Sequence, residues 1–446
     1  MSFPLITERG PVTIRKSVPV LILALIASSL VAVPTAEAKK RPKCFGRVAT
    51  KVGTKKAELL TGTSKADVIV ALGGADQIEG KGGNDLICGG GGGDLILGSE
   101  GDDRIDGQGG NDSIFGMEGN DEIKLGGGRI NDTTGGPGDD VLTGGNGFDL
   151  AGYVDAPNGV NVDLAAGTAS GGDGADTLSG IDGVAGSGAD DTLRGTAGTN
   201  LLFGAGGNDS IFTGGNTGNF ATPTTPAVDV VSGDGDPQAP PGNDTLTGGA
   251  GMNIVDYSFS ETAVQVDLSL GTANGEGLDT LSGFQVVVGS EFDDSLTGDG
   301  NDNAFQPYLG NDDVDGGGGA DLAVFASAAN SVVADLATGN ATGEGTDTLS
   351  GIENLWGSPS ADTLTGDDGP NAIYSLGGND RITAAAGDDR LDGGTGIDAL
   401  DGGDGNDRCS AGETNTNCEL SQAATSPSLL PQVWRMVQRL GRSTIR

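Results

Sequence analysis

A nine-residue period limits what this chain can fold into more than any other feature of its sequence. Between residues 67 and 121 seven aspartates stand at consecutive nine-residue intervals, and isoleucine follows each of them by two positions. Glycine precedes six of the seven aspartates by two positions, and Lys65 takes that place before Asp67. A disordered segment has no reason to keep such a phase, so the pattern predicts a repeat protein.

The same period returns twice further along the chain. A short run contains Asp294, Asn303, Asp312 and Asp321. A longer run occupies residues 362–409, where leucine, isoleucine or Cys409 stands two positions after each acidic or amide residue. The repeat therefore extends well beyond the first array.

Each unit divides into a six-residue turn and a three-residue strand, as in GGGGGDLIL at residues 89–97. The glycines permit positive φ angles and close approach of backbones in the turn. The strand is too short to stand alone, so its central aliphatic side chain must enter a core shared with neighbouring units. The sequence thus predicts an all-β fold, a parallel β-roll or β-solenoid in several stacked segments.

Stacking of such units would bring carboxylates together. If two nonapeptides complete one coil, aspartates 18 residues apart, such as Asp76 and Asp94, lie on the same side of successive coils. Ca²⁺ favours several carboxylate and carbonyl oxygens, whereas Mg²⁺ keeps its waters and demands a stricter octahedron. We therefore expect multiple Ca²⁺ ions, with these candidate ligands: Asp67, Asp76, Asp85, Asp94, Asp103, Asp112, Asp121, Asp140, Asp149, Asp191, Asp209, Asp244, Asp294, Asp312, Asp321, Asp362, Asp380, Asp389, Asp398 and Asp407.

Several units resemble a known repeat. Residues 107–115 (GQGGNDSIF) and 393–401 (GGTGIDALD) are similar to G-G-x-G-x-D-x-U-x, the calcium-binding nonapeptide of RTX, or hemolysin-type, proteins. The resemblance is strongest over residues 62–124 and 362–409. It implies that two of these aspartates and turn carbonyls from adjacent coils hold each ion.

The composition is strongly acidic. The formal net charge is −39 and aromatic residues make up only 4% of the chain, a combination that also suits a disordered protein. The regular phase argues against disorder. Such a chain repels itself unless cations or protons neutralise it, and it excludes nucleic acid as a partner.

Residues 1–38 predict a cleavable secretory signal. Arg9, Arg15 and Lys16 precede an uncharged stretch at 17–35, and Ala36-Glu37-Ala38 offers the small residues that a signal peptidase recognises. An uncleaved anchor is the alternative, but the apolar run is shorter than the ~20 residues that cross a bilayer. We expect a secreted, extracellular protein with no membrane span.

The rest of the chain divides by its repeats. The expected segments are an N-terminal calcium-binding roll (39–128), degenerate repeats with a first long spacer unit (129–212), a Pro-rich insertion loop (213–243), middle repeats with second and third spacer units (244–361), a C-terminal calcium-binding roll (362–419) and a basic tail (420–446). We expect the tail to be a docked cap or a solvated end, rather than a targeting or membrane-surface element.

Two departures from the repeat affect its expected sites. The three spacer units each contain Asp-Thr-Leu-Ser-Gly, beginning at Asp176, Asp279 and Asp347. Similar spacers in RTX-type proteins form wider coils that continue the solenoid, and the residues alone do not decide whether they bind an ion. Asn303 and Asn371 replace carboxylate by amide, so their sites should be weaker or lost.

Four cysteines fit export to an oxidising compartment. They permit three pairings, among which closeness along the chain favours Cys409 with Cys418 and leaves Cys44 with Cys88. The chain has no histidine and no Cys-x-x-Cys spacing, so we expect no metal site built from these thiols.

The functional expectation is a calcium-binding structural or adhesive scaffold whose partner is a cell-surface or matrix polysaccharide or protein. The alternative is an extracellular enzyme that acts on polysaccharide through paired carboxylates. The lack of histidine removes the histidine-ligated zinc proteases and the Ser-His-Asp triad. No segment of about 100 residues outside the repeats can house another domain. We therefore expect no enzyme and name no catalytic residue.

Overall fold

The computed structural model describes residues 41–214, 228–234, 241–418 and 420–421. The expected secretory signal, residues 1–38, and nearly all of the basic tail, 420–446, lie outside these residues. In the described ranges no helix is long and apolar enough to cross a membrane.

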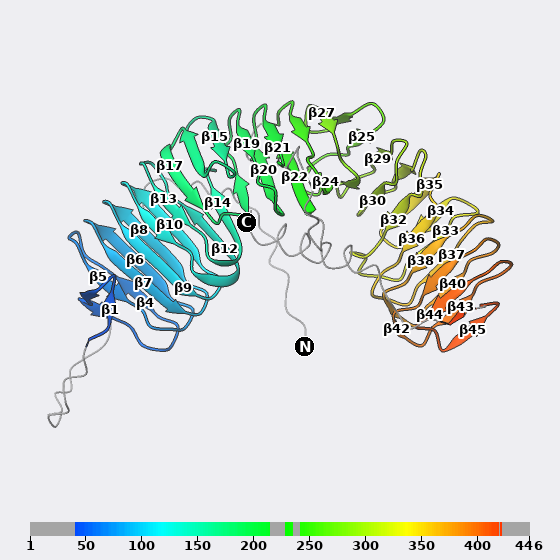
Figure 1. Ribbon diagram of the computed structural model, residues 1–446, viewed down its shortest axis with the longest axis horizontal. Helices are drawn as coiled ribbons and strands as arrows, with labels where there is room; N and C mark the ends of the chain where they lie inside the picture. Colours follow the sequence, from blue (N-terminus) through cyan, green and yellow to red (C-terminus); the bar gives the residue numbers. More distant parts are fainter. Residues whose placement is uncertain (1–40, 215–227, 235–240, 419, 422–446) are drawn as a thin grey trace, which may run out of the picture. The chain divides into compact units, whose positions relative to one another are not determined.

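The repeat folds into coils of 18 residues, which confirms that two nonapeptides complete one turn of the solenoid. Ile78 pairs with Ile96 and Ile96 with Ile114, all in parallel strands. Ile87 pairs with Ile105 in the same way on the other side of the coil. Figure 1 shows these strands side by side, with the sequence running from blue to red through successive coils.

Within the described ranges the main sheet has 42 strands, and these form two ladders. Ladder 1 contains β4 (Leu59–Thr61), β6 (Gln77–Gly82), β8 (Leu95–Glu100), β10 (Ser113–Glu118), β12 (Gly127–Thr134), β14 (Asn146–Gly152), β18 (Gly183–Ala185), β20 (Leu201–Ala205), β22 (Val228–Asp234), β24 (Met252–Asp256), β28 (Val286–Val288), β30 (Ala304–Gln306), β32 (Leu322–Val324), β36 (Asn354–Trp356), β38 (Ala372–Tyr374), β41 (Arg390–Asp392), β44 (Arg408–Ser410) and β46 (Leu420–Ser421).

Ladder 2 faces ladder 1 across the core. Its strands, in order of pairing, are β3 (Lys51–Val52), β5 (Val68–Val70), β7 (Leu86–Gly91), β9 (Arg104–Gly109), β11 (Glu122–Lys124), β13 (Val141–Thr143), β17 (Gly174–Ser179), β16 (Thr168–Gly171), β15 (Val160–Asp163), β19 (Thr192–Arg194), β21 (Ser210–Phe212), β23 (Thr245–Thr247), β27 (Leu278–Ser282), β26 (Thr272–Asn274), β25 (Gln265–Asp267), β29 (Ser295–Thr297), β31 (Asp313–Asp315), β35 (Thr346–Ser350), β34 (Asn340–Thr342), β33 (Val333–Asp335), β37 (Thr363–Thr365), β40 (Arg381–Thr383), β43 (Ala399–Asp401) and β45 (Thr414–Thr416). Two short pairs stand apart: β1 (Lys43–Cys44) with β2 (Arg47–Val48), and β39 (Gly377–Gly378) with β42 (Thr395–Gly396).

The main core lies between the ladders, and most of its side chains come from the central residues of the short strands. The seven isoleucines of the first array are all 0–1% exposed: Ile69, Ile78, Ile87, Ile96, Ile105, Ile114 and Ile123. Because successive side chains of a strand point to opposite faces, only one residue in three can enter this core. The thin core explains why the chain folds with so few aromatic residues.

The spacer units continue the solenoid, as the resemblance implied. In the first unit β15, β16 and β17 pair antiparallel. The outer two of these strands rejoin ladder 2 in parallel, since β17 pairs with β13 and β15 pairs with β19. Each unit therefore inserts an antiparallel hairpin without breaking the stack.

The prediction of an insertion loop at 213–243 is wrong for residues 228–234. Residues 228–234 form β22, which is buried along its whole length and pairs parallel with β20 and β24. The prolines that suggested a loop all lie outside this strand, at Pro223, Pro226, Pro237, Pro240 and Pro241. The short apolar run between them completes a coil of ladder 1.

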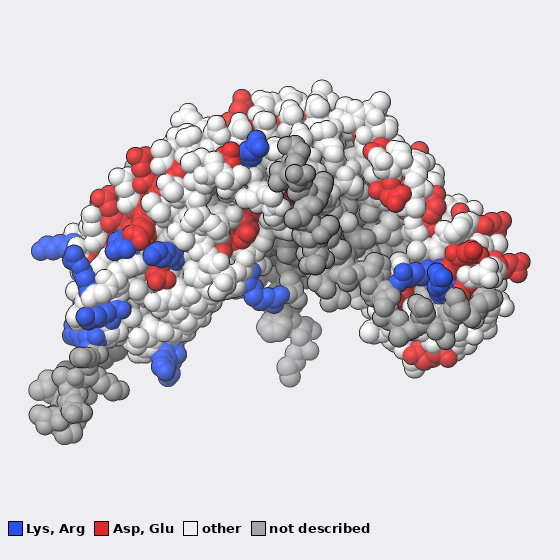
Figure 2. Space-filling model, viewed as in Figure 1, with Lys and Arg blue, Asp and Glu red and all other residues white. Residues whose placement is uncertain are grey.

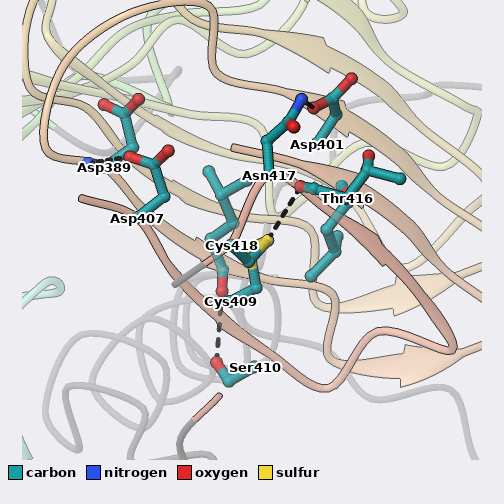
Figure 3. The surroundings of a disulfide bond; sticks show 10 residues. Asp389, Asp401, Asp407, Cys409, Ser410, Thr416, Asn417 and Cys418 are labelled. Carbon is teal, nitrogen blue, oxygen red and sulfur yellow. Dashed lines mark hydrogen bonds between the residues drawn. A yellow bond between two sulfur atoms is a disulfide. The ribbon is translucent and has the colours of Figure 1, made fainter. Parts of the chain in front are cut away.

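Both disulfides follow the pairing that chain proximity favoured. Cys44 of β1 bonds to Cys88 of β7, and Cys409 of β44 bonds to Cys418. Figure 3 shows the second disulfide close to Asp407, whose carboxylate accepts a hydrogen bond from the backbone of Asp389. The two crosslinks thus involve early and late coils of the described solenoid.

Candidate metal sites

The aspartates of the repeat stack directly on one another. The backbone N–H of Asp76 donates to Asp94 Oδ1 at 2.9 Å, and that of Asp94 donates to Asp112 Oδ1 at 2.9 Å. Asp85 donates in the same way to Asp103 at 2.7 Å. One oxygen of each of these carboxylates therefore accepts a hydrogen bond from the coil before it.

The structure divides the 20 candidate aspartates between two stacks, because each coil has a turn before each of its ladders. The turns before ladder 2 hold Asp67, Asp85, Asp103, Asp121, Asp140, Asp191, Asp209, Asp244, Asp294, Asp312, Asp362, Asp380 and Asp398. The turns before ladder 1 hold Asp76, Asp94, Asp112, Asp149, Asp321, Asp389 and Asp407.

The second oxygen of most of these carboxylates is buried and has no hydrogen-bond partner among the described residues. The oxygens concerned are Oδ2 of Asp76, Asp85, Asp94, Asp103, Asp112, Asp121, Asp140, Asp209, Asp244, Asp312, Asp321, Asp380, Asp389 and Asp398. A buried charged oxygen without a partner is costly unless a proton or a cation compensates for it. These atoms therefore have the chemistry expected of ligands to a hard cation.

Glycine keeps the space beside these oxygens open. A Cβ added at Gly89 would lie 2.5 Å from Asp94 Oδ2, and one added at Gly107 would lie 2.5 Å from Asp112 Oδ2. No three Asp, Glu or Cys side chains of the described ranges group together as a metal site. An ion held here must therefore take ligands from the main chain as well, which suits Ca²⁺ and its preference for carbonyl oxygens.

The electrostatics of the stacks favour neutralisation. Burial raises the pKa of Asp103 to about 7 and that of Asp140 to about 8, and neighbouring carboxylates add to both shifts. Figure 2 shows Lys and Arg gathered mainly over the first coils, while acidic side chains extend along the visible face. Arg104 and Lys124 pair with Glu122, and Arg194 pairs with Asp163; neither of these carboxylates belongs to the stacks.

We expect protons to replace part of the stabilisation that cations give. Burial raises the pKa of Asp85 and Asp94 to about 6, above the ordinary value of about 3.9 in the unfolded chain. The ion-free fold is therefore most favoured below about pH 4 and loses stability as the pH rises through 6 to 8. In excess chelator, far-UV circular dichroism should show more β structure at about pH 4 than at about pH 8. A β signal that decreases on acidification would contradict this account.

Five candidate aspartates differ from those with unpartnered Oδ2 atoms, because protein donors reach both of their carboxylate oxygens. They are Asp67, Asp149, Asp191, Asp294 and Asp362. Burial alone would raise the pKa of Asp67, but hydrogen bonds from Thr63 and Thr50 lower it below its ordinary value. Burial still raises the pKa of Asp191, Asp294 and Asp362, although hydrogen bonds to both oxygens of each oppose that shift.

The amides continue the stacks with neutral groups. Asn303 Oδ1 accepts from the backbone of Asp299 at 2.8 Å, and Asn371 Oδ1 accepts from that of Asp367 at 2.9 Å. Asn131, which the sequence pattern missed, links Asp112 to Asp149 through its own amide. The expectation of weaker or lost sites at Asn303 and Asn371 stays a prediction, and their amide oxygens already have protein donors.

The pattern also missed three aspartates of the spacer units. Asp176, Asp279 and Asp347 accept the backbone N–H groups of Asp140, Asp244 and Asp312, at 2.9, 3.0 and 3.2 Å. Each therefore extends the carboxylate stack of ladder 2. A Leu two positions after each of them matches the repeat and could have identified them. The inserted hairpin, however, lengthens the interval between stacked aspartates from 18 to 35 or 36 residues.

Parallel ladders whose glycine turns stack buried carboxylates define a β-solenoid of the β-roll type. The chain belongs to the RTX calcium-binding nonapeptide-repeat proteins. The model of the RTX calcium-binding nonapeptide repeat (4 copies) matches residues 52–87, 61–96, 89–123, 131–151, 185–218, 241–258, 347–382, 356–391 and 383–415. No curated protein matches the chain. The chain is thus a calcium-binding repeat protein, and its matched segments cover both of the regular arrays.

Proposed function

We propose that this protein is a secreted scaffold that folds when it binds multiple Ca²⁺ ions and then serves a structural or adhesive role outside the cell. The observation that carries the proposal is the series of buried Oδ2 atoms without hydrogen-bond partners among the described residues. Each is an unfavourable arrangement in the absence of a cation and a favourable one in its presence.

In this proposal the turn carboxylates with unpartnered Oδ2 atoms hold the ions, together with carbonyl oxygens of the glycine turns. The two regular arrays, within residues 39–128 and 362–419, form the calcium-binding rolls. Bound calcium supplies positive charge that neutralises the stacked carboxylates and joins successive coils. The Oδ1 atoms of the same aspartates keep the coils in register through backbone N–H groups.

Calcium and folding are coupled because the rest of the fold is thin. Most strands of three residues contribute one side chain to the core, and this burial must offset the conformational entropy of long glycine-rich turns. Without calcium, apposed carboxylates add repulsion to that cost. We expect an expanded chain in chelator and a cooperative transition to the solenoid with calcium.

An extracellular location agrees with the two disulfides, which persist in oxidising compartments. Calcium-binding modules that work outside cells commonly have dissociation constants of about 10⁻⁴–10⁻³ M. The long faces of a folded solenoid suit a surface or matrix polysaccharide or protein as partner. We propose no catalytic role, since the stacked carboxylates already hold backbone N–H groups.

The test is far-UV circular dichroism of the disulfide-intact mature protein, titrated from excess chelator to about 10 mM calcium, above the range of extracellular modules. We expect a cooperative gain of β signal with calcium and little or none with magnesium at the same concentration. A spectrum that stays disordered throughout, or one that is fully β in chelator at neutral pH, would contradict calcium-coupled folding.

A further inference from the structure

The turns before the two ladders occur in two conformations. In one, the residue four positions before the aspartate has a positive φ angle; these open turns precede Asp76, Asp85, Asp94, Asp103, Asp112, Asp121, Asp140, Asp209, Asp312, Asp321, Asp380, Asp389, Asp398 and Asp407. In the other, the N–H of that residue donates to the carboxylate; these closed turns precede Asp67, Asp149, Asp191, Asp294 and Asp362.

A closed turn saturates its carboxylate. At Asp294 the N–H of Ser290 donates to Oδ2 at 2.6 Å, its hydroxyl donates to Oδ1 at 2.6 Å, and the N–H of Val264 donates to Oδ1 at 2.8 Å. Ser358 makes the same pair of contacts with Asp362, at 2.6 and 2.7 Å. Ser290 and Ser358 are 0% exposed, so these donors do not exchange readily with water.

The position two residues before the aspartate explains which conformation forms. Open turns have glycine there, and in most of them its φ angle is positive, as in Gly92 and Gly110. Four of the five closed turns have a residue with a Cβ instead: Lys65, Ala189, Phe292 and Ser360. A side chain disfavours positive φ, so the turn takes the conformation in which the backbone N–H points to the carboxylate.

Closed turns also have a regular place in the fold. Asp191, Asp294 and Asp362 each stand in the first nonapeptide turn after a spacer unit, where they accept N–H groups from Val160, Val264 and Val332. In each case a valine, rather than an aspartate, stands at the preceding step of the stack. The carboxylate therefore has no second carboxylate in the coil before it. The hydroxyl and the N–H complete its coordination with protein donors.

A tyrosine closes the other side of two spacer units. Tyr153 donates to Asp176 Oδ2 at 2.9 Å, and Tyr257 donates to Asp279 Oδ2 at 2.9 Å. The third unit has Phe325 in the same place, and Asp347 Oδ2 is buried without a hydrogen-bond partner among the described residues. The equivalent backbone bonds, from Tyr257 to Val288 and from Phe325 to Trp356, are present in both units.

We propose that protein donors replace calcium in the closed turns and in the first two spacer units, whereas calcium binds at the open turns and beside Asp347. This inference rests on the proposed function and divides its candidate ligands, except Asp244, into two sets. Asp67, Asp149, Asp191, Asp294 and Asp362 belong to the set that binds no ion, and Asp347 joins the set that does. The solenoid then contains ion-free coils at fixed places between its calcium-binding coils.

The test counts bound calcium per chain by equilibrium dialysis of the full mature protein in saturating calcium. Asp312→Asn, in an open turn, should lose at least one ion, whereas Asp294→Asn, in the closed turn 18 residues earlier in the same stack, should keep the wild-type number. Asp380→Asn and Asp362→Asn form a second pair should either variant fail to fold. Equal losses in the open and closed members of a folded pair would overturn the proposal. Wild-type protein that binds no calcium would instead overturn the proposed function.

A reciprocal exchange tests the tyrosines with the same measurement. Phe325→Tyr should give one ion fewer than the wild type, because its hydroxyl supplies the donor that Asp347 lacks. Tyr257→Phe should give one ion more, a gain that a purely structural role of the hydroxyl does not produce. Both side chains have a precedent at the equivalent place, so both variants should fold. Unchanged ion numbers in the two variants would overturn this part of the assignment.

Discussion

Replacing Ile105 by alanine is expected to lower the unfolding free energy of the calcium-loaded protein by about 2–5 kcal/mol, the usual cost of such a truncation in a packed core. Ile105 is 0% exposed and lies between Ile87 and Ile123 in ladder 2. Each coil of a solenoid contacts mainly its neighbours, so the loss of amide-exchange protection should be concentrated in β7, β9 and β11. Urea unfolding gives the size of the effect, and amide hydrogen exchange gives its location.

The matched control is Ile397→Ala in the last array. Ile397 is 70% exposed, so its truncation removes the same atoms without leaving a cavity and should change stability by less than about 0.5 kcal/mol. Equal effects of the two substitutions would mean that the isoleucine ladder is not the core of the fold. A loss of exchange protection spread over all coils would mean that the solenoid unfolds as a single unit.

The ladder could be predicted from sequence because its period determines both its register and its core. An aliphatic residue two positions after each aspartate must lie at the centre of a three-residue strand, and the 18-residue coil aligns Ile78 with Ile96. The stacking of Asp76 on Asp94 follows from the same period. Wherever the interval stays at nine residues, local pattern and tertiary contact carry the same information.

The spacer units could be located from sequence, but the stacking partners of their aspartates could not be predicted. Asp140 and Asp176 are 36 residues apart and yet form adjacent steps of one stack, because the intervening hairpin leaves ladder 2 and returns to it. No fixed interval marks such a neighbour. Strand β22 escaped prediction for a related reason, since the prolines around it dominate the composition of its segment.

The residue type four positions before the aspartate does not distinguish open from closed turns. Ser99 has a φ angle of 86° in the open turn before Asp103, whereas Ser187 donates its N–H to Asp191. Leu72 and Lys81 also have positive φ angles, 80° and 84°, so the repeat imposes this conformation on residues that ordinarily avoid it. Glycine at the position two residues before the aspartate predicts an open turn, except at Asp149, where Gly147 precedes a closed one.

Loss of the Cys44–Cys88 disulfide is expected to raise the calcium concentration needed to fold the first coils. The bond joins residues 44 positions apart, and closing a loop of that length stabilises the folded state by about 4 kcal/mol in the chain-entropy description. The closed loop contains Asp67, Asp76 and Asp85. Calcium must supply the missing free energy when the crosslink is absent, so the midpoint of the circular dichroism titration should move upward in Cys44→Ala/Cys88→Ala.

The second disulfide provides the comparison, since Cys409 and Cys418 are only 9 positions apart. In the same description, closing this shorter loop stabilises the folded state by about 3 kcal/mol. Figure 3 places it at the last nonapeptide turn, beside Asp407. Cys409→Ala/Cys418→Ala should therefore move the midpoint less, and its effect should be confined to the C-terminal coils in hydrogen exchange. If the short loop matters more than the long one, the disulfides act by packing at the ends of the core rather than by limiting the freedom of the unfolded chain. Since the long loop encloses the first carboxylates of the array, the larger shift we expect would mean that the crosslink prepares these coils for calcium.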